Sequence, residues 1–202
     1  TVVPFLFMAL GGFKDNYEII TVKPRLMPQQ GFDLRKFEAL IDYWPFWRNM
    51  YNSVVVAGGT TIAAGFFCAL AGYTFAKFRF PGKNALFIMV LASMMIPISS
   101  RIVPSYVVVK ALGGVNTYWA LIIPIMIPPF GIFMVRQYAH AGIPDELLES
   151  ARIEGASEWH VFSRLVLPLM APILISLGIL TFMMAWNEFL WPLVVTTRRE
   201  ML

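Results

Sequence analysis

The 202-residue sequence has few charged residues, one cysteine and two histidines, and each shortage excludes a class of protein. Charged side chains make up 14% of the residues and hydrophobic ones 58%, which lies outside the composition of ordinary soluble domains. The lone Cys68 cannot form an internal disulfide, and its apolar surroundings in the sequence favour a small packing residue. Neither His140 nor His160 has a second ligand at a metal-binding spacing. The composition therefore predicts a membrane protein without a metal centre.

Motifs for covalent chemistry and nucleotide binding are also missing. The sequence has no G-x-x-x-x-G-K-[S/T] phosphate loop, no nucleophile elbow and no zinc motif. Its formal net charge of +4 is scattered along the chain, which gives nucleic-acid binding little support and suits anionic lipid headgroups. We therefore expect a chain that is not an enzyme and that takes any energy it needs from a partner or an ion gradient.

In place of such motifs, the sequence contains long runs of uncharged residues. A helix of about 20 apolar residues crosses a hydrocarbon core of about 30 Å. The runs predict an all-α, multi-pass transmembrane bundle with four complete spans and the end of a fifth. In this interpretation residues 1–202 form a single transmembrane domain, with the end of a first span at 1–13, an external segment at 14–50, spans at 51–77, 84–104, 116–140 and 164–190, and a polar connection at 143–163.

Two patterns within the spans indicate how they pack. Pairs of small residues recur every seven residues at Ala57-Gly58, Ala64-Gly65 and Ala71-Gly72, so we expect one helix stripe that lets another helix approach closely. Prolines interrupt the spans at 84–104 and 116–140, and each removes helical hydrogen bonds. In a membrane the freed carbonyls need partners in protein or in a water-filled cavity. Two irregular helices in succession favour a path that opens and closes; kinks that serve packing alone are the alternative.

The short connection around Lys77, Arg79 and Lys83 is basic, which places it on the cytoplasmic side. Alternation of sides then places the polar connection at 143–163 inside as well. Counting at about 1.5 Å per residue along a straight helix puts Glu188 at the outer membrane boundary. The same count puts Arg101 near the outer edge. In the external segment, Asp33 is the expected N-cap of an amphipathic surface helix.

The polar connection itself has the pattern of a short, capped helix outside the bilayer. Pro144 suits a first helical turn, and the acidic residues that follow lie near the positive end of the helix dipole. Gly155 is placed to end the helix in a left-handed conformation. Leu147, Leu148, Ala151 and Ile153 offer apolar contacts to a groove on a partner. A loop that only connected two membrane spans would not need such a helix.

This connection resembles the EAA loop of ATP-binding-cassette (ABC) importer permeases, whose pattern is Glu-Ala-Ala, three residues, Gly, and a later hydrophobic-x-Leu-Pro. The matching residues here are Glu149-Ser150-Ala151, Gly155 and Leu167-Pro168. The resemblance covers nearly the whole chain and is strongest to maltose-type permeases of the carbohydrate-importer branch. Its other motifs are Asn52-Ser53, Phe78 to Gly82, Ile143-Pro144 and Ala185 to Pro192. Ser150 replaces the usual Ala and Glu154 the usual Asp, and both changes keep the helix and its charge.

The resemblance implies a type I (MetI-like) ABC importer permease fold, here without the start of the first span and all of the last. It implies a multi-pass subunit of the bacterial cytoplasmic (inner) membrane that pairs with a second homologous permease and receives solute from an extracytoplasmic solute-binding protein. Two cytoplasmic ABC ATPases would hold ATP and Mg²⁺, so this chain would bind no cofactor. The residues expected to dock on an ATPase are Glu149, Ser150, Ala151, Arg152, Glu154, Gly155 and Ala156.

Sugar is the solute that the resemblance favours. The coupling loop does not separate sugars from a polyol, a glycerol phosphate or a peptide, and the solute-contacting residues stay unassigned. A membrane channel or scaffold without ATPase partners is the alternative from another class.

Overall fold

The structure, a computed structural model, describes residues 2–20, 26–28, 31–32, 35–43 and 45–198. These residues form helices and no strand, which confirms the predicted all-α class. The chain divides into two compact units, residues 1–49 and 50–202, and each is described by itself.

The described residues of the first unit form three short helices: α1 (Val3–Gly11), α2 (Asn16–Ile19) and α3 (Arg35–Tyr43). The Phe13 ring contacts those of Phe32 and Phe37, with centroids 5.1 and 5.2 Å apart. The predicted amphipathic helix is therefore present as α3. Its predicted N-cap, Asp33, lies outside the described residues.

The second unit is arranged around α4 (Phe46–Lys77), whose 32 residues extend about 48 Å at the usual helical rise. Among the described residues α4 is the one helix that is long and apolar enough to cross a membrane alone. Three bent pairs reach that length together, so the part of the chain that the structure describes has up to four spans by length and composition. The pairs are α5 (Lys83–Ser93) with α6 (Ile98–Ala111), α7 (Tyr118–Ile122) and η1 (Ile123–Ile125) with α8 (Pro129–Gly142), and Glu158–Leu169 with α12 (Ala171–Trp186).

The bends occur where prolines interrupt the backbone hydrogen bonds. Pro97 stands between α5 and α6, which meet at 104°, and Pro128 precedes α8, which is bent by 49° from α7 and η1. The third bend, of 74°, follows α10 (Glu158–His160), the π-helix η2 (Val161–Val166) and α11 (Leu167–Leu169). The segments predicted as spans at 84–104 and 164–190 are therefore not straight helices. Pro104, in contrast, lies inside α6 without ending it.

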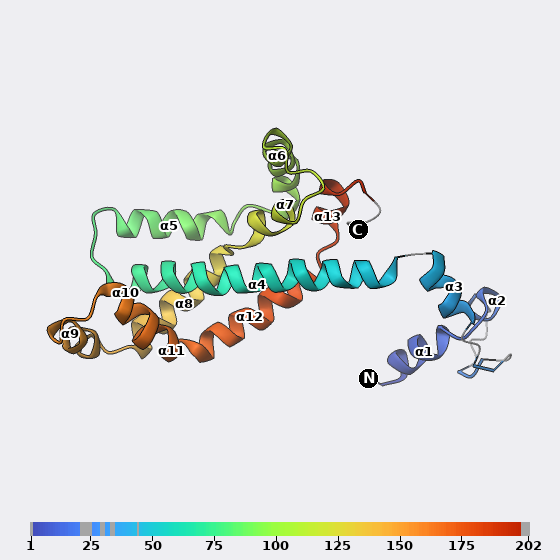
Figure 1. The fold of residues 1–202 in the computed structure, drawn as a ribbon, viewed down its shortest axis with the longest axis horizontal. Coiled ribbons are helices and arrows are strands. Elements are labelled where there is room, and N and C mark those ends of the chain that lie inside the picture. The colour runs from blue at the N-terminus through green and yellow to red at the C-terminus, as the bar shows by residue number, and fades with distance from the viewer. Residues whose placement is uncertain (1, 21–25, 29–30, 33–34, 44, 199–202) are drawn as a thin grey trace. The chain divides into compact units, whose positions relative to one another are not determined.

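Figure 1 shows α5 and α12 on opposite sides of α4, with α8 crossing α4 and α9 (Asp145–Ile153) and α10 at one end. The larger buried cluster joins α4, α8, α9, η2 and α12. Close approach depends on Gly72 of α4, because a Cβ there would lie 2.7 Å from the side chain of Val135 in α8. A smaller cluster holds α13 (Leu190–Val195) against α7, where Trp191 Nε1 donates to the carbonyl of Ala120 at 2.9 Å.

The predicted stripe of small residues on α4 is only partly used inside the chain. Ala57 and Ala64 are fully buried and Gly72 contacts α8. A Cβ at Gly58 or Gly65 would meet no described atom within 4 Å. The heptad spacing indicated a stripe correctly, but it did not show which of its members meet a helix of this chain.

Candidate functional site

The polar helix α9 begins and ends through backbone geometry that the sequence largely predicts. Pro144 stands just before the helix in an extended conformation, with φ −65° and ψ 138°, so α9 starts one residue later than expected. At the other end Gly155 has φ +84°, which confirms the predicted left-handed position. The amide of Ala156 donates to the carbonyl of Ala151 at 3.1 Å, and that of Gly155 donates to Arg152 at 3.0 Å. These two bonds form a Schellman motif that closes the helix.

Lys77, the last residue of α4, attaches the start of α9 to the long helix. Its Nζ donates to the carbonyl of Ile143 at 2.6 Å and to Oδ1 of Asp145 at 2.7 Å. The ammonium group holds the pKa of the Asp145 carboxyl below its usual value. The lysine side chain is almost fully buried, which keeps water from the bond to Ile143. The basic connection and the polar helix therefore lie at the same end of the unit, as alternation of sides requires.

Arg152 attaches the end of α9 to the start of α10. Its Nε donates to Oε1 of Glu158 at 2.7 Å, and its Nη2 donates to Oε2 at 3.2 Å. The Glu158 carboxylate raises the pKa of the guanidinium. Ser157 caps α10 by accepting a hydrogen bond from the amide of His160 at 3.3 Å. The sharp turn at Gly155 is therefore held on both sides.

The side chains of α9 divide into an inner and an outer set. Leu148 is 2% exposed and packs in the chain's own core, with Ala151 partly buried beside it. The expectation that Leu148 faces a partner is therefore wrong. Leu147 and Ile153 are exposed, Ile153 to 86%. Of the seven residues predicted to dock, the exposed ones are Glu149, Ser150, Arg152, Glu154 and Gly155, and the partly buried ones are Ala151 and Ala156.

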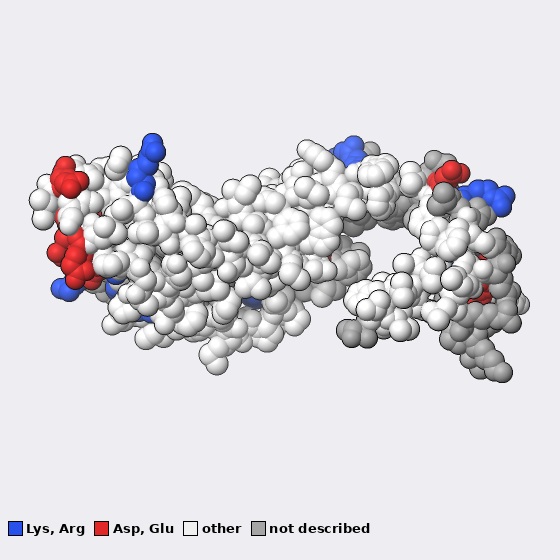
Figure 2. Space-filling model, turned by 90° about the horizontal axis from the view of Figure 1, so that it is seen from below, with Lys and Arg blue, Asp and Glu red and all other residues white. Residues whose placement is uncertain are grey.

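Acidic side chains gather on the surface of this end, as Figure 2 shows. Five of the seven acidic residues in the sequence of the second unit lie between Asp145 and Glu158. Ser150, where the EAA pattern has alanine, donates from Oγ to the carbonyl of Glu146 at 2.9 Å. Its hydroxyl is therefore satisfied within the helix.

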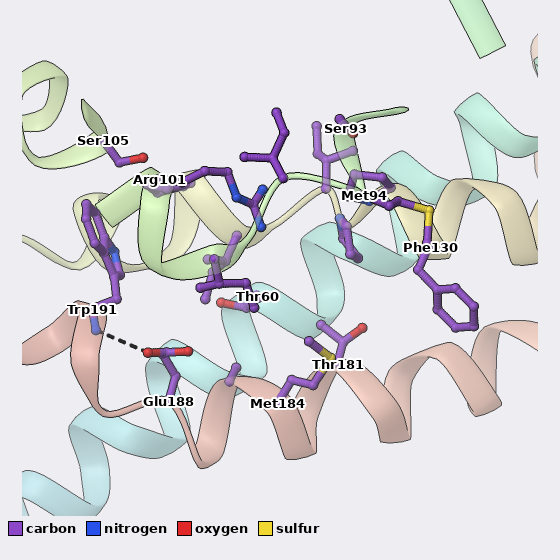
Figure 3. Close-up of a pocket in the computed structure, with 18 of the residues that line it drawn as sticks. Thr60, Ser93, Met94, Arg101, Ser105, Phe130, Thr181, Met184, Glu188 and Trp191 are labelled. Atoms are coloured by element: carbon purple, nitrogen blue, oxygen red, sulfur yellow. Dashed lines mark hydrogen bonds between the residues drawn. The ribbon is translucent and has the colours of Figure 1, made fainter. Parts of the chain in front are cut away.

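A second feature, which the sequence did not identify, is an open cavity of about 440 Å³ in the second unit, whose lining includes exposed side chains such as Ile98 and Met184. Its walls come from α4 and from the helix breaks around residues 93–98, 124–130 and 184–191. Figure 3 shows Thr60 of α4, Arg101 of α6 and Glu188 of the turn before α13 around one space. Glu188 and Arg101 were expected at the outer boundary from a count along straight helices. The count assumed straight helices, whereas both segments are bent, so the placement of Glu188 and Arg101 at the outer boundary stays a prediction.

Glu188 also has a structural part in this turn. Its Oε1 accepts a hydrogen bond from the amide of Trp191 at 3.1 Å, which stabilises the first turn of α13. Among the described residues, no three His, Cys, Asp or Glu side chains lie close enough to hold a metal ion.

A bundle of bent helix pairs that surround a cavity, with an anchored polar helix at one end, has the architecture of a multi-pass membrane transport subunit. The comparisons with known proteins specify that class. The chain belongs to the family of binding-protein-dependent transport system inner membrane components, which matches residues 50–201. It is thus the permease type of subunit, a membrane protein and not itself an enzyme.

Among its relatives is the arabinooligosaccharides transport system permease protein of Bacillus subtilis strain 168, which is 32% identical over 98% of this chain and 71% of the relative. The protein of that name from Halalkalibacterium halodurans is 34% identical over 99% of the chain and 72% of the relative. The sn-glycerol-3-phosphate transport system permease protein of Salmonella typhi is 38% identical over 76% of the chain and 54% of the relative.

A solved structure confirms the fold. One chain of a bacterial ABC transporter involved in the import of the acidic polysaccharide alginate superposes with a TM-score of 0.86, over 99% of this chain and 70% of that chain. The sequence identity is 18%, so this likeness concerns the fold alone.

Proposed function

We propose that the chain is a permease subunit of an ATP-driven sugar importer in the bacterial cytoplasmic membrane. It forms the translocation pathway with a second, homologous permease and receives sugar from an extracytoplasmic solute-binding protein. Two cytoplasmic ABC ATPases hold ATP and Mg²⁺ and move the permeases through α9. The observation that carries the proposal is an exposed polar helix that is attached at both ends to the membrane-spanning helices.

The contacts of α9 suit the transmission of force. A push on its start passes through Asp145 to Lys77 and so to α4, which extends along the whole unit. A push on its end passes through Arg152 to Glu158 and into η2 and α12. The exposed Ile153 offers an apolar contact for a groove on the ATPase, with acidic side chains around it to fix the orientation.

The relatives support sugar as the solute class. Two of those named above are permeases for arabinooligosaccharides and align with nearly the whole of this chain. The glycerol 3-phosphate permease aligns with a smaller part of it. A glycerol phosphate is therefore the second candidate. A channel without ATPase partners is less favoured because it would not need the doubly anchored helix.

The glycine at the end of α9 gives a direct test. Gly155→Val should abolish ATP-coupled uptake and keep membrane insertion, because a β-branched residue is poorly tolerated at φ +84°. Gly82→Val is the matched control, since Gly82 has φ +79° and equally open surroundings but lies outside α9. Uptake, ATPase activity stimulated by loaded binding protein, and membrane yield would be measured on the intact transporter. Wild-type uptake by Gly155→Val would refute the assignment of the coupling loop.

Charge reversal on α9 tests whether this helix docks on the ATPase subunits. Replacing Glu149 and Glu154 together by lysine should weaken co-purification of the ATPase subunits, because both carboxylates lie on the exposed side of α9. The double change to glutamine removes the charge without reversing it, and its effect should fall between wild type and the lysine variant. If all three proteins retain the ATPase equally, this surface of α9 faces water.

A further inference from the structure

Three cationic side chains meet where α4 ends and α5 begins, and we call Arg79, Lys83 and Arg136 the basic corner. Nζ of Lys83 donates to the carbonyl of Ala76 at 3.4 Å. Nε of Arg136, which comes from α8, donates to the carbonyl of Phe75, also at 3.4 Å. Lys83 and Arg136 are therefore held on adjacent carbonyls in the last turn of α4.

The described residues do not supply the negative charge that would balance the basic corner. None of its three side chains lies in an ion pair with them. The charges that act most strongly on the Lys83 ammonium group are positive, those of Arg136 and Arg79. Asp145, whose carboxylate attracts Arg79, is bonded to Lys77. Since the carbonyl end of a helix contributes only about half a negative charge, the basic corner keeps an excess of positive charge.

The two arginines of the basic corner have donors that these contacts leave unused. The guanidinium of Arg136 lies 4.1 Å from the ring centroid of Phe87, and its Nη1 donates to Oε1 of Gln137 at 2.9 Å. Its Nη2 makes no hydrogen bond to the described residues, and neither does the exposed side chain of Arg79. The Arg136 guanidinium is thus fixed by a ring and a carbonyl while it keeps donors for an external acceptor.

Exposed apolar side chains begin directly beside the basic corner. Lys83 is the first residue of α5, and α5 with α6 forms one of the bent pairs that are long and apolar enough to cross a membrane. Leu86, one turn further along α5, is 45% exposed, and Ile88 and Met89 are exposed as well. The cations therefore lie at the end of a candidate span, at the level of the phosphates of a leaflet, with the apolar side chains at the level of its acyl chains.

We propose that the basic corner binds the headgroup of an anionic phospholipid whose acyl chains lie along α5. A phosphodiester carries one negative charge and has two oxygens that accept hydrogen bonds from guanidinium groups, so it can bind Arg79 and Arg136 beside the Lys83 ammonium. Free phosphate would leave Leu86 and Met89 uncovered. The inference goes beyond the proposed function, because it concerns a ligand from the membrane and needs neither solute nor ATPase.

The test measures lipid binding by the intact purified transporter. Native mass spectrometry compares the retention of phosphatidylglycerol with that of phosphatidylcholine of the same chain length. We expect wild type to retain phosphatidylglycerol preferentially and Arg79→Gln to bind it about 5-fold more weakly, the contribution of one cation near an anionic headgroup. Because the Arg79 side chain makes no hydrogen bond to the described residues, this change should leave the melting midpoint in neutral detergent unaltered.

Arg164→Gln is the matched control. Arg164 of η2 is also exposed and also forms no ion pair with the described residues, but it does not belong to the basic corner. We expect this variant to bind phosphatidylglycerol as wild type does. A second measurement compares the melting midpoints with phosphatidylglycerol and with inorganic phosphate, and only the lipid should raise the midpoint of wild type.

Three results would overturn the lipid site. Equal losses of phosphatidylglycerol in Arg79→Gln and Arg164→Gln would show a general attraction of anionic lipid to cations. An equal rise in the melting midpoint with inorganic phosphate would identify the ligand as the free anion. No preference of wild type for phosphatidylglycerol over phosphatidylcholine would show that a protein partner covers the basic corner. The proposed coupling through α9 stands in each case, since it is tested by uptake.

Discussion

Gly72 and Gly65 lie seven residues apart on α4, and replacing each by alanine should have opposite effects on stability. A Cβ at Gly72 would lie 2.7 Å from Cβ and Cγ1 of Val135 and 2.9 Å from the backbone nitrogen of Arg136. Since one of these atoms belongs to the backbone of α8, a rotamer change cannot relieve the overlap. A Cβ at Gly65 would meet no described atom within 4 Å.

The magnitude follows from two opposing contributions. Overpacking that forces backbone shifts costs about 1–3 kcal/mol, while the helix propensity of alanine over glycine returns up to about 1 kcal/mol. Gly72→Ala should therefore destabilise the protein by about 1–2 kcal/mol, and Gly65→Ala should be neutral or stabilising by up to about 1 kcal/mol. Adding Val135→Ala should relieve only part of the loss, because the Cβ of residue 135 and the amide of Arg136 remain.

The assay is thermal denaturation of the purified transporter, followed by tryptophan fluorescence, with uptake measured in parallel. We expect a lower midpoint for Gly72→Ala than for wild type, and an unchanged or higher one for Gly65→Ala. Equal midpoints for the two variants would show that α4 and α8 do not pack at Gly72, and the reasoning from close approach would fail.

Two further predictions concern the attachments of α9. Because Lys77 lowers the pKa of Asp145, this pair stabilises the fold above the unfolded-state pKa of Asp145, and that stability is lost as the pH falls through its folded-state pKa. Carbon NMR titration should show a lower Asp145 pKa in wild type than in Lys77→Met. Equal pKa values in the two proteins would contradict the Lys77–Asp145 bond. Arg152→Lys cannot keep both hydrogen bonds to Glu158. Because the two side chains are 37% and 50% exposed, the fall in the melting midpoint should correspond to a loss of at most about 1 kcal/mol in the free energy of unfolding. A larger loss would show that the turn at Gly155 depends on this pair alone.

The ends of α9 could be predicted from the sequence because local chemistry decides them. A glycine after a short polar helix has a strong preference for the left-handed position, and Gly155 adopts it with the expected backbone bonds. The burial of Leu148 could not be predicted in this way. Leu147 and Leu148 are both apolar, and which of them faces inward depends on where η2 and α4 lie.

The bends show the same division between local and distant causes. A proline such as Pro97 shows where a helical hydrogen bond is lost, but the angle of 104° depends on the elements that pack against α5 and α6. A count at the helical rise assumes that the axis is straight. That assumption failed for Glu188, since its segment bends by 74° after α11 and α12 ends at Trp186.

The cavity could not be found from the sequence because nothing local marks Thr60. A threonine in a helix commonly bonds to the carbonyl four residues earlier, as Thr61 does, and then needs no other partner. Only the placement of three helix breaks around α4 leaves the Thr60 hydroxyl buried and unpaired. Pro97 and Pro128 mark two of the bends beside the cavity, so the residues that remove helical hydrogen bonds also shape its walls. Straightening a single bend, for example by replacing Pro128, should therefore reduce the polarity of the cavity as well as its volume.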